Sequence, residues 1–309
     1  MEFVINELPV KTWNWLDVNE KKVNMSDAYD ELEPLFIRAN ESETKTFNAT
    51  FDFENEVSSN CGIRKKINLE VDNDASLMVV FEYKGCMFNA FEELRFSVSD
   101  SAKLTVVQIF EFDDKGEGVC VSKVEGDVSK NGSFNLIQIC KGGRDVSMGV
   151  NVNLLGDDSS ASIDTGYLVS GANALDINYV IRHMGQRSDS KINVSGVLRD
   201  RAKKTFRGTI DFICGSKNAT GDEREDVLLM DSGVLNNTTP LILCGEENVE
   251  GAHGASIGKI SDEAMYYFNT RGIREDEVNE IMANSRLNAV ISRIPDAKVR
   301  EKYKGNKEL

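Results

Sequence analysis

Residues 149–171 read G-V-N-V-N-L-L-G-D-D-S-S-A-S-I-D-T-G-Y-L-V-S-G, two alternating runs separated by the turn Gly156-Asp157-Asp158. Alternation with a period of two residues is typical of β-strands, and a cluster of Gly and Asp marks a turn. Small residues alternate with aliphatic ones, as a coil needs where neighbouring rungs stack and side chains point inward. This stretch therefore predicts two strands joined at a corner.

Similar runs extend on both sides of this stretch. From Thr46 to Leu243 the chain is almost entirely strand-like, and long helical patterns are absent. After residue 149 the strands recur at intervals of roughly fifteen residues, near Val150, Ile163, Ile177, Ile192 and Phe206. This spacing is wider than that of a hairpin ladder and predicts a solenoid with two long strands per coil. An antiparallel sandwich is the competing architecture.

Changes of pattern divide the chain into three parts. Residues 1–45 form an N-terminal leader, in which we expect a short helix from Ser26 to Ala39. Residues 46–258 form the β core. Residues 259–309 form a C-terminal helical region, whose first helix Ser261 is placed to cap.

Composition narrows the class of protein. The chain has 309 residues, of which 40% are hydrophobic, so it is long enough to bury a core. Its formal net charge of −15 argues against nucleic acid and anionic membranes as partners. No stretch approaches the roughly 20 apolar residues that span a bilayer, and the N-terminus lacks a signal-peptide pattern, so we expect a cytoplasmic protein. The six cysteines lack the tight spacing of a disulfide framework, and we expect them to be reduced.

The loop from Pro240 to Gly258 concentrates side chains of metal-binding types. It carries a thiol, three carboxylates and an imidazole, on Cys244, Glu246, Glu247, Glu250 and His253. Thiolate and imidazole together suit zinc, copper or iron–sulfur centres, whereas calcium and magnesium take oxygen ligands. The separation of Cys244 and His253 matches no standard zinc spacing. The competing interpretation is a buried cysteine at a strand end, a solvated acidic turn and a structural histidine.

This loop and the helix after it resemble the signature of the SufB/SufD family, the scaffold proteins of SUF iron–sulfur cluster assembly. In that family an acidic turn precedes a V-x-x-x-H-G/A-A-S/T segment and a D-E-x-x-x-Y/F-x-x-x-R-G-I/L helix. The matching positions are Val249, His253, Gly254, Ala255, Ser256, Asp262, Glu263, Tyr267, Arg271, Gly272 and Ile273. A T-W-x-x-L-x-V-N element from Thr12 and the segment at residues 196–210 are similar to the family as well. The resemblance implies a right-handed parallel β-helix with a C-terminal helical subdomain.

The resemblance also implies a function. It implies a scaffold that is not itself an enzyme and that holds or hands on a transient iron–sulfur cluster of the 4Fe–4S type. The candidate ligands are Cys244, His253 and Cys214, with Glu247 and Glu250 as candidate carboxylate ligands. The longer SufB proteins carry an essential cysteine upstream of the histidine, and the corresponding segment here, L-L-M-D-S-G-V-L-N-N, has none.

Two other interpretations of the sequence stay open. One is a SufD-like structural subunit of the scaffold complex, which holds no cluster alone. The other, which the sequence favours less, is a carbohydrate-active β-helix enzyme, because no particular pair of carboxylates stands out.

Partners follow from the same resemblance. In the family the C-terminal helical region binds the SufC ATPase, so we expect an ABC-type ATPase to contact Met265, Tyr267, Phe268, Arg271 and Ile281. The competing interpretation is that these side chains only pack onto the last coil. We expect two copies of the chain, or this chain and a second SufB/SufD-type protein, to join through the last coils of their solenoids. No nucleic acid and no membrane is expected as a partner.

Overall fold

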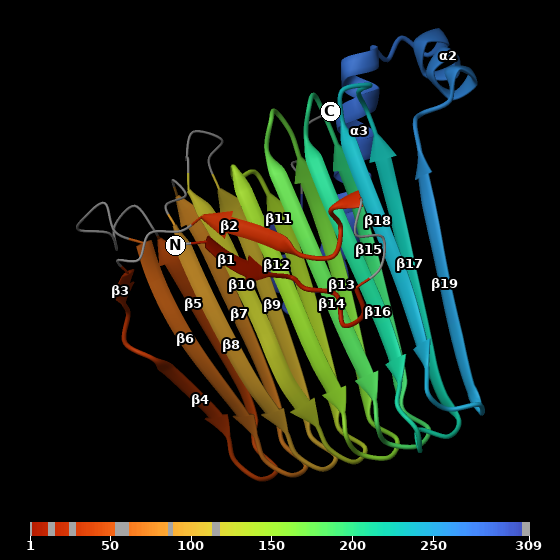
Figure 1. Cartoon of the computed structure of the whole chain (residues 1–309). Helices are drawn as coiled ribbons and strands as arrows, with labels where there is room; N and C mark the ends of the chain where they lie inside the picture. The colour runs from red at the N-terminus through yellow and green to blue at the C-terminus, as the bar shows by residue number, and fades with distance from the viewer. Residues whose placement is uncertain are drawn as a thin grey trace.

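The computed structural model describes residues 2–11, 16–24, 29–52, 62–85, 89–112 and 118–304. Most of these residues belong to two long β-sheets that lie face to face (Figure 1). The first sheet contains β3 (Tyr29–Glu31), β4 (Leu35–Ala39), β6 (Gly62–Val71), β8 (Ala90–Val98), β10 (Val119–Val128), β12 (Asp145–Leu154), β14 (Ala174–His183), β16 (Lys203–Phe212) and β18 (Leu235–Cys244). The second sheet contains β5 (Thr44–Asp52), β7 (Ser76–Gly85), β9 (Lys103–Phe112), β11 (Ser133–Lys141), β13 (Ser160–Val169), β15 (Asp189–Leu198), β17 (Ala219–Leu229) and β19 (Val249–Gly258).

Strand pairing within both sheets is parallel, and from β4 onward successive strands alternate between the sheets. The five predicted strand centres fall on β12 to β16 in order. One coil therefore separates Ile163 of β13 from Ile192 of β15, and the two residues pair in register. The parallel β-solenoid is confirmed, and the antiparallel sandwich is wrong. Local alternation does not distinguish the two, because strands of both kinds share the two-residue period.

Apolar side chains fill the space between the sheets. Residues in register stack from coil to coil, and aromatic rings stack in the same way: the ring centroids of Tyr83 and Phe110 lie 4.7 Å apart. At the corners between the first and the second sheet, polar residues adopt a left-handed backbone conformation, at Asp74, Ser101, Asn131, Asp158, Arg187 and Asn218. The corners also bond to one another, as when the backbone N–H of Asp74 donates to the carbonyl of Asp100 at 3.1 Å. Stacking thus extends through both the core and the corners.

The N-terminal residues form an antiparallel hairpin of β1 (Glu2–Ile5) and β2 (Lys21–Asn24). The hairpin lies across the outer face of the first sheet (Figure 1). Arg207 of β16 is almost completely buried and holds this segment. Its guanidinium donates to the backbone carbonyls of Val18 and Glu20 and, at 2.8 Å, to the Asp176 carboxylate.

The helix that we predicted from Ser26 to Ala39 is wrong for the described residues. Residues 29–31 and 35–39 form β3 and β4, and β4 pairs in register with residues 67–71 of β6. Backbone hydrogen bonds to the first sheet override the weak helical preference of so short a segment. Ser26 and the leader residues 12–15 lie outside the described residues, and the predicted boundary at residue 45 falls inside β5.

Three helices follow β19: α2 (Asp262–Thr270), α3 (Glu275–Ile291) and α4 (Ala297–Tyr303). Ser261 caps α2, since its hydroxyl accepts a hydrogen bond from the N–H of Ala264 at 3.2 Å. α3 and α4 fold back onto the outer face of the second sheet, where Leu287 and Val290 pack in one cluster with Ile137 and Ile139. α2 buries no residue and projects from the body (Figure 1). Within the described ranges, no helix has the length and apolar character that crossing a bilayer requires.

Candidate functional site

The last coil of the solenoid is open. β18 and β19 end the orders of their sheets, and among the described residues each pairs on one side only. Every residue of β19 after Val249 is exposed. Figure 1 shows these two strands at the end of the solenoid that lies opposite β4. The internal surface of the last coil is therefore presented to solvent.

His253 lies in the middle of β19 at an inward-facing position. It pairs in register with Glu223, which pairs with Ile192 of the preceding coil. Glu223 and Ile192 are both buried in the solenoid. Residues in register on parallel strands point to the same face of the sheet. His253 is therefore the exposed end of a ladder whose earlier members fill the interior.

Cys244 ends a second internal ladder. It pairs with Phe212, which pairs with His183, and the last two side chains are fully buried. Cys214 lies in the corner after β16, next to the corner that carries Gly245. Cys214 and Cys244 are free thiols and are exposed. Cys214 and Cys244 therefore lie in neighbouring coils.

His183 is a buried structural residue. Its two ring nitrogens lie 2.8 Å from the hydroxyls of Ser188 and Ser190. Burial lowers its pKa to about 4, so the ring is neutral at physiological pH. A neutral, saturated imidazole inside the core has no free nitrogen to bind a ligand.

The segment from Pro240 to Gly258, which we predicted to be a loop, forms the end of β18, a corner and β19, and its carboxylates do not gather around His253. Glu246 is occupied by its own corner, where it accepts hydrogen bonds from the N–H groups of Gly215 at 3.0 Å and Glu247 at 3.1 Å. The bond from Gly215 is the largest cause of its lowered pKa. Glu247 lies in the same corner, and Glu250 pairs in register with Thr220. An odd separation along a strand places Glu250 on the face opposite to His253.

The predicted soft ligands are also well separated within one chain. Cys244 ends β18, whereas His253 lies four positions beyond Val249 in β19. At about 3.3 Å per residue, the imidazole lies roughly 13 Å along the strand from the corner. Two ligands of one metal ion lie within about 4.6 Å of each other, because each bond is at most about 2.3 Å long. Among the described residues, no group of three or more His, Cys, Asp or Glu side chains is arranged to hold a metal ion.

Beneath His253 the interior is polar, which we did not predict. Lys204 forms a buried ion pair with Glu225, and Thr238 donates to the same carboxylate at 2.6 Å. Burial, with a smaller contribution from the charge of Glu225, raises the pKa of Glu223 to about 8. Burial also lowers the pKa of Lys204, although Glu225 opposes this.

A sequence signal for this polar set exists in G-D-E-R-E-D at residues 221–226. The two glutamates are two positions apart, so they share one face of a strand. The alternation does not say whether that face is the interior, and for charged residues the exposed face is the ordinary assignment.

The helical tail presents aromatic side chains to solvent. Tyr266 and Tyr267 of α2 are 72% and 55% exposed. The guanidinium carbon of Arg271 lies 5.3 Å from the centroid of the Tyr267 ring. The other predicted contact residues are half-buried: Met265, Phe268 and Ile281. The predicted contact residues are thus at least partly accessible, and Tyr266 is an exposed aromatic residue that we did not single out.

Comparison with protein families identifies one match. Residues 55–286 match the family model described as "SUF system FeS cluster assembly, SufBD core domain". The matched range includes every strand from β6 to β19 and most of α3. The open last coil, with Cys244 and His253, thus lies within the matched core.

Individual relatives carry the same description. The iron–sulfur cluster assembly protein SufD of Bacillus subtilis is 27% identical over 143 residues, which are 46% of this chain and 33% of that protein. A SufBD family protein of Mycobacterium leprae is 24% identical over 247 residues, 76% of this chain and 62% of that protein. SufB of Bacillus subtilis is 26% identical over 113 residues, 37% of this chain and 24% of that protein. The matches span less than two thirds of each of these relatives.

Proposed function

Because the chain belongs to the SufBD family of the SUF iron–sulfur cluster assembly system, we propose that it is a scaffold subunit without catalytic turnover. In this proposal the subunit holds or hands on a nascent cluster of the 4Fe–4S type. The cluster is cargo that passes through the protein. The site is the open last coil, and the subunit works in the cytoplasm.

One observation carries this proposal: two internal ladders end in solvent at Cys244 and His253. Thiolate and imidazole are the protein ligands that iron–sulfur centres accept. Both side chains face the space between the two sheets, as their buried partners one coil earlier do, and the side that a further coil would cover is open. A second subunit seated on this end would enclose both side chains.

The separation of the ligands favours a site shared between two subunits. One chain places Cys244 at the corner and His253 farther along β19, and the described residues contain no complete ligand group. A partner that continues the two sheets would add its own ligand side chains across the junction. The partner in this proposal is a second copy of the chain or another SufB/SufD-type protein. Unpaired edges of β18 and β19 support such pairing, since their free N–H and C=O groups can extend a sheet.

The helical tail is the proposed contact for an ABC-type ATPase. α2 buries no side chain of its own, although it carries two exposed tyrosines. Aromatic residues are enriched at protein interfaces. The tail is also connected directly to β19, so a partner bound to α2 would act close to His253.

A second candidate is a SufD-like structural subunit that holds no cluster alone. The separation of Cys244 from His253 favours this candidate, because one chain then supplies only part of the ligands that a cluster needs. The two candidates differ in whether two copies of this chain bind iron or whether a different SufB-type chain is required.

Anaerobic reconstitution with ferrous iron and sulfide tests the proposal, with iron and acid-labile sulfide measured per chain. We expect His253→Ala and Cys244→Ser to reduce bound iron by at least half, because each removes one ligand. Ser256→Ala on the outer face of β19 is the matched control and is expected to leave loading unchanged. Equal loading of all four proteins would show that the cluster site lies elsewhere. Loading only after a SufB-type chain is added would instead establish the structural-subunit candidate.

A further inference from the structure

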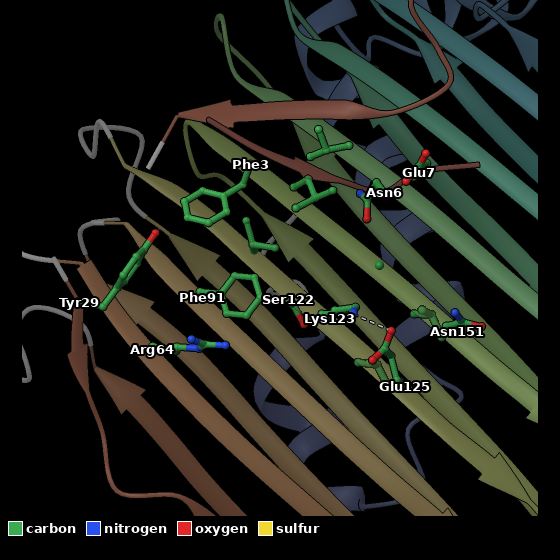
Figure 2. A pocket seen from close by; sticks show the side chains of 16 residues that line it. Phe3, Asn6, Glu7, Tyr29, Arg64, Phe91, Ser122, Lys123, Glu125 and Asn151 are labelled. Atoms are coloured by element: carbon green, nitrogen blue, oxygen red, sulfur yellow. Dashed lines mark ion pairs between the residues drawn. The ribbon is translucent and has the colours of Figure 1, made fainter. Parts of the chain in front are cut away.

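A cavity of about 450 Å³ lies far from the open coil, between β1 and the outer face of the first sheet. Figure 2 shows Phe3 of β1 over the floor that Phe91 of β8 helps to form. Val121 of β10 is part of the same floor, and Lys123 and Asn151 line the cavity farther along. The cavity is therefore apolar where Phe3, Phe91 and Val121 line it and polar where Lys123 and Asn151 do. Cavities of about 300–1,000 Å³ are the size at which proteins bind small molecules.

The cavity is a built feature of the hairpin and the sheet. Asn6, which follows β1, donates to the carboxylate of Asp176 at 2.7 Å and fixes the position of the roof. A Cβ at Gly149 would lie 2.7 Å from the Asn6 amide oxygen, so the Asn6 side chain would have to shift from its place. Glycine at this position leaves room for the Asn6 side chain, which bonds to Asp176 and so holds β1 over the sheet.

Arg64 stands at the mouth of the cavity with unused hydrogen-bonding capacity. Its guanidinium carbon lies 5.4 Å from the centroid of the Phe91 ring. The nearest carboxylate oxygens, of Glu31 and Glu93, lie 3.9 and 3.6 Å from its terminal nitrogens, beyond hydrogen-bond distance. Its Nε is buried and has no hydrogen-bond partner among the described residues.

Two other arginines of the chain have guanidinium groups whose donors are engaged in hydrogen bonds within the protein. Arg207 donates to three acceptors, and Arg38 donates to both oxygens of Asp72 at 2.9 and 3.1 Å. Arg64 makes neither arrangement, although aromatic contact holds its planar group in place. A fixed guanidinium with free donors is suited to take a carboxylate or phosphate through two parallel hydrogen bonds.

The surroundings of Arg64 are basic in a chain that is acidic overall. The adjoining hollow is lined by Arg64, Lys66 and Arg95 together with one carboxylate, Glu93, and Asn68. Arg95 donates to Glu93 at 2.6 Å, so the only carboxylate in that lining is already engaged. Glu31 lies 3.9 Å from Arg64 and 3.8 Å from Lys66, so three cationic side chains here face two carboxylates, and the remaining positive charge attracts an anion.

We propose that this cavity binds a small organic acid, with its aromatic or aliphatic body between Phe3 and Phe91 and its carboxylate or phosphate on Arg64. Burial of the apolar body against Phe3, Phe91 and Val121 supplies affinity. The guanidinium supplies orientation and selects anions over neutral molecules of the same shape. The site is independent of the open coil and of the cluster proposed there.

A matched pair of fluorescent probes tests this site. 1-Anilinonaphthalene-8-sulfonate is an aromatic anion, and N-phenyl-1-naphthylamine has the same ring system without the charged group. We expect Arg64→Gln to weaken binding of the anion at least tenfold and to change binding of the neutral probe less than twofold. Val121→Trp, which fills the floor, is expected to abolish binding of both probes. Arg224→Gln on the outer face of β17, where the side chain is exposed, is the control for loss of one positive charge and is expected to change neither.

Displacement of the anionic probe identifies the acid group. Octanoate carries a carboxylate on an aliphatic body, and phenyl phosphate carries a phosphate on an aromatic one. Displacement by either supports the site, and their relative strength assigns the preferred group. Displacement by neither overturns the proposal. So does equal weakening by Arg64→Gln and Arg224→Gln, or an unchanged anion affinity in Arg64→Gln. The last two results do not depend on whether Val121→Trp folds.

Discussion

Replacing Glu92 with glutamine is expected to stabilise the protein at neutral pH and to have almost no effect in acid. Glu92 of β8 lies inside the solenoid, where it accepts a hydrogen bond from the side chain of Gln108 at 2.8 Å. Burial raises its pKa from the ordinary 4.5 to about 7, although hydrogen bonds from Tyr83 and Gln108 oppose the rise. Glutamine has nearly the same shape and can keep the bond from Gln108 through its carbonyl oxygen.

The sign and the size follow from proton linkage. Between pH 4.5 and 7 the unfolded chain ionises at this position while the folded chain stays protonated, so the free energy of unfolding falls as pH rises. Each pH unit costs about 1.4 kcal/mol, so the wild type has lost about 3 kcal/mol by pH 7 and loses little more above it. Glutamine does not ionise and avoids this loss. The stability advantage of Glu92→Gln should therefore grow from near zero at pH 4.5 to about 3 kcal/mol at pH 7.

Urea denaturation at a series of pH values measures this difference, and the neighbouring residue provides a matched control. Glu93 lies on the opposite face of β8. Burial raises its pKa, but the hydrogen bond and charge of Arg95, together with Arg64 and Lys123, lower it overall. Glu93→Gln should therefore be less stable than the wild type at neutral pH, and its deficit should disappear as pH falls. A stability difference for Glu92→Gln that does not change with pH would refute the reasoning.

Three other outcomes are expected. Arg207→Met should cost about 3–5 kcal/mol of stability, because it removes a charge that is buried with its partners, and limited proteolysis should then cut the N-terminal hairpin first. Replacing both Tyr266 and Tyr267 by serine should leave the midpoint of thermal unfolding unchanged, because both side chains are exposed. The same variant should co-purify more weakly with an ABC-type ATPase. Strong destabilisation would show that α2 packs onto the body. In the single chain, without a partner on the open coil, iodoacetamide at pH 8 should label the exposed Cys244 rapidly and Cys140 only after unfolding, because burial raises the pKa of the Cys140 thiol to about 12. Peptide mass spectrometry measures both rates, and equal labelling would contradict the assigned burial.

The strand pattern of the core could be predicted because it is local. Alternation around Val150, Ile163 and Ile177 reflects the two faces of each strand, and spacing along the chain reflects the length of one coil. The same local logic failed between residues 26 and 39, where the described part forms strands. There the strand conformation depends on pairing with β6. The residues of β6 lie far along the chain, so the local sequence pattern does not show this pairing.

The sequence by itself determined that a thiol and an imidazole, side-chain types that iron–sulfur centres accept as ligands, stand near the end of the β core at Cys244 and His253. Only the tertiary structure decided that both end internal ladders at an open coil, that Glu250 points to the opposite face, and that Glu223 and Lys204 make the interior beneath them polar. The physical reason is that residue type and strand period are properties of neighbours in the chain. Which face is buried, and where the stacking of coils stops, depend on contacts between residues one coil or more apart.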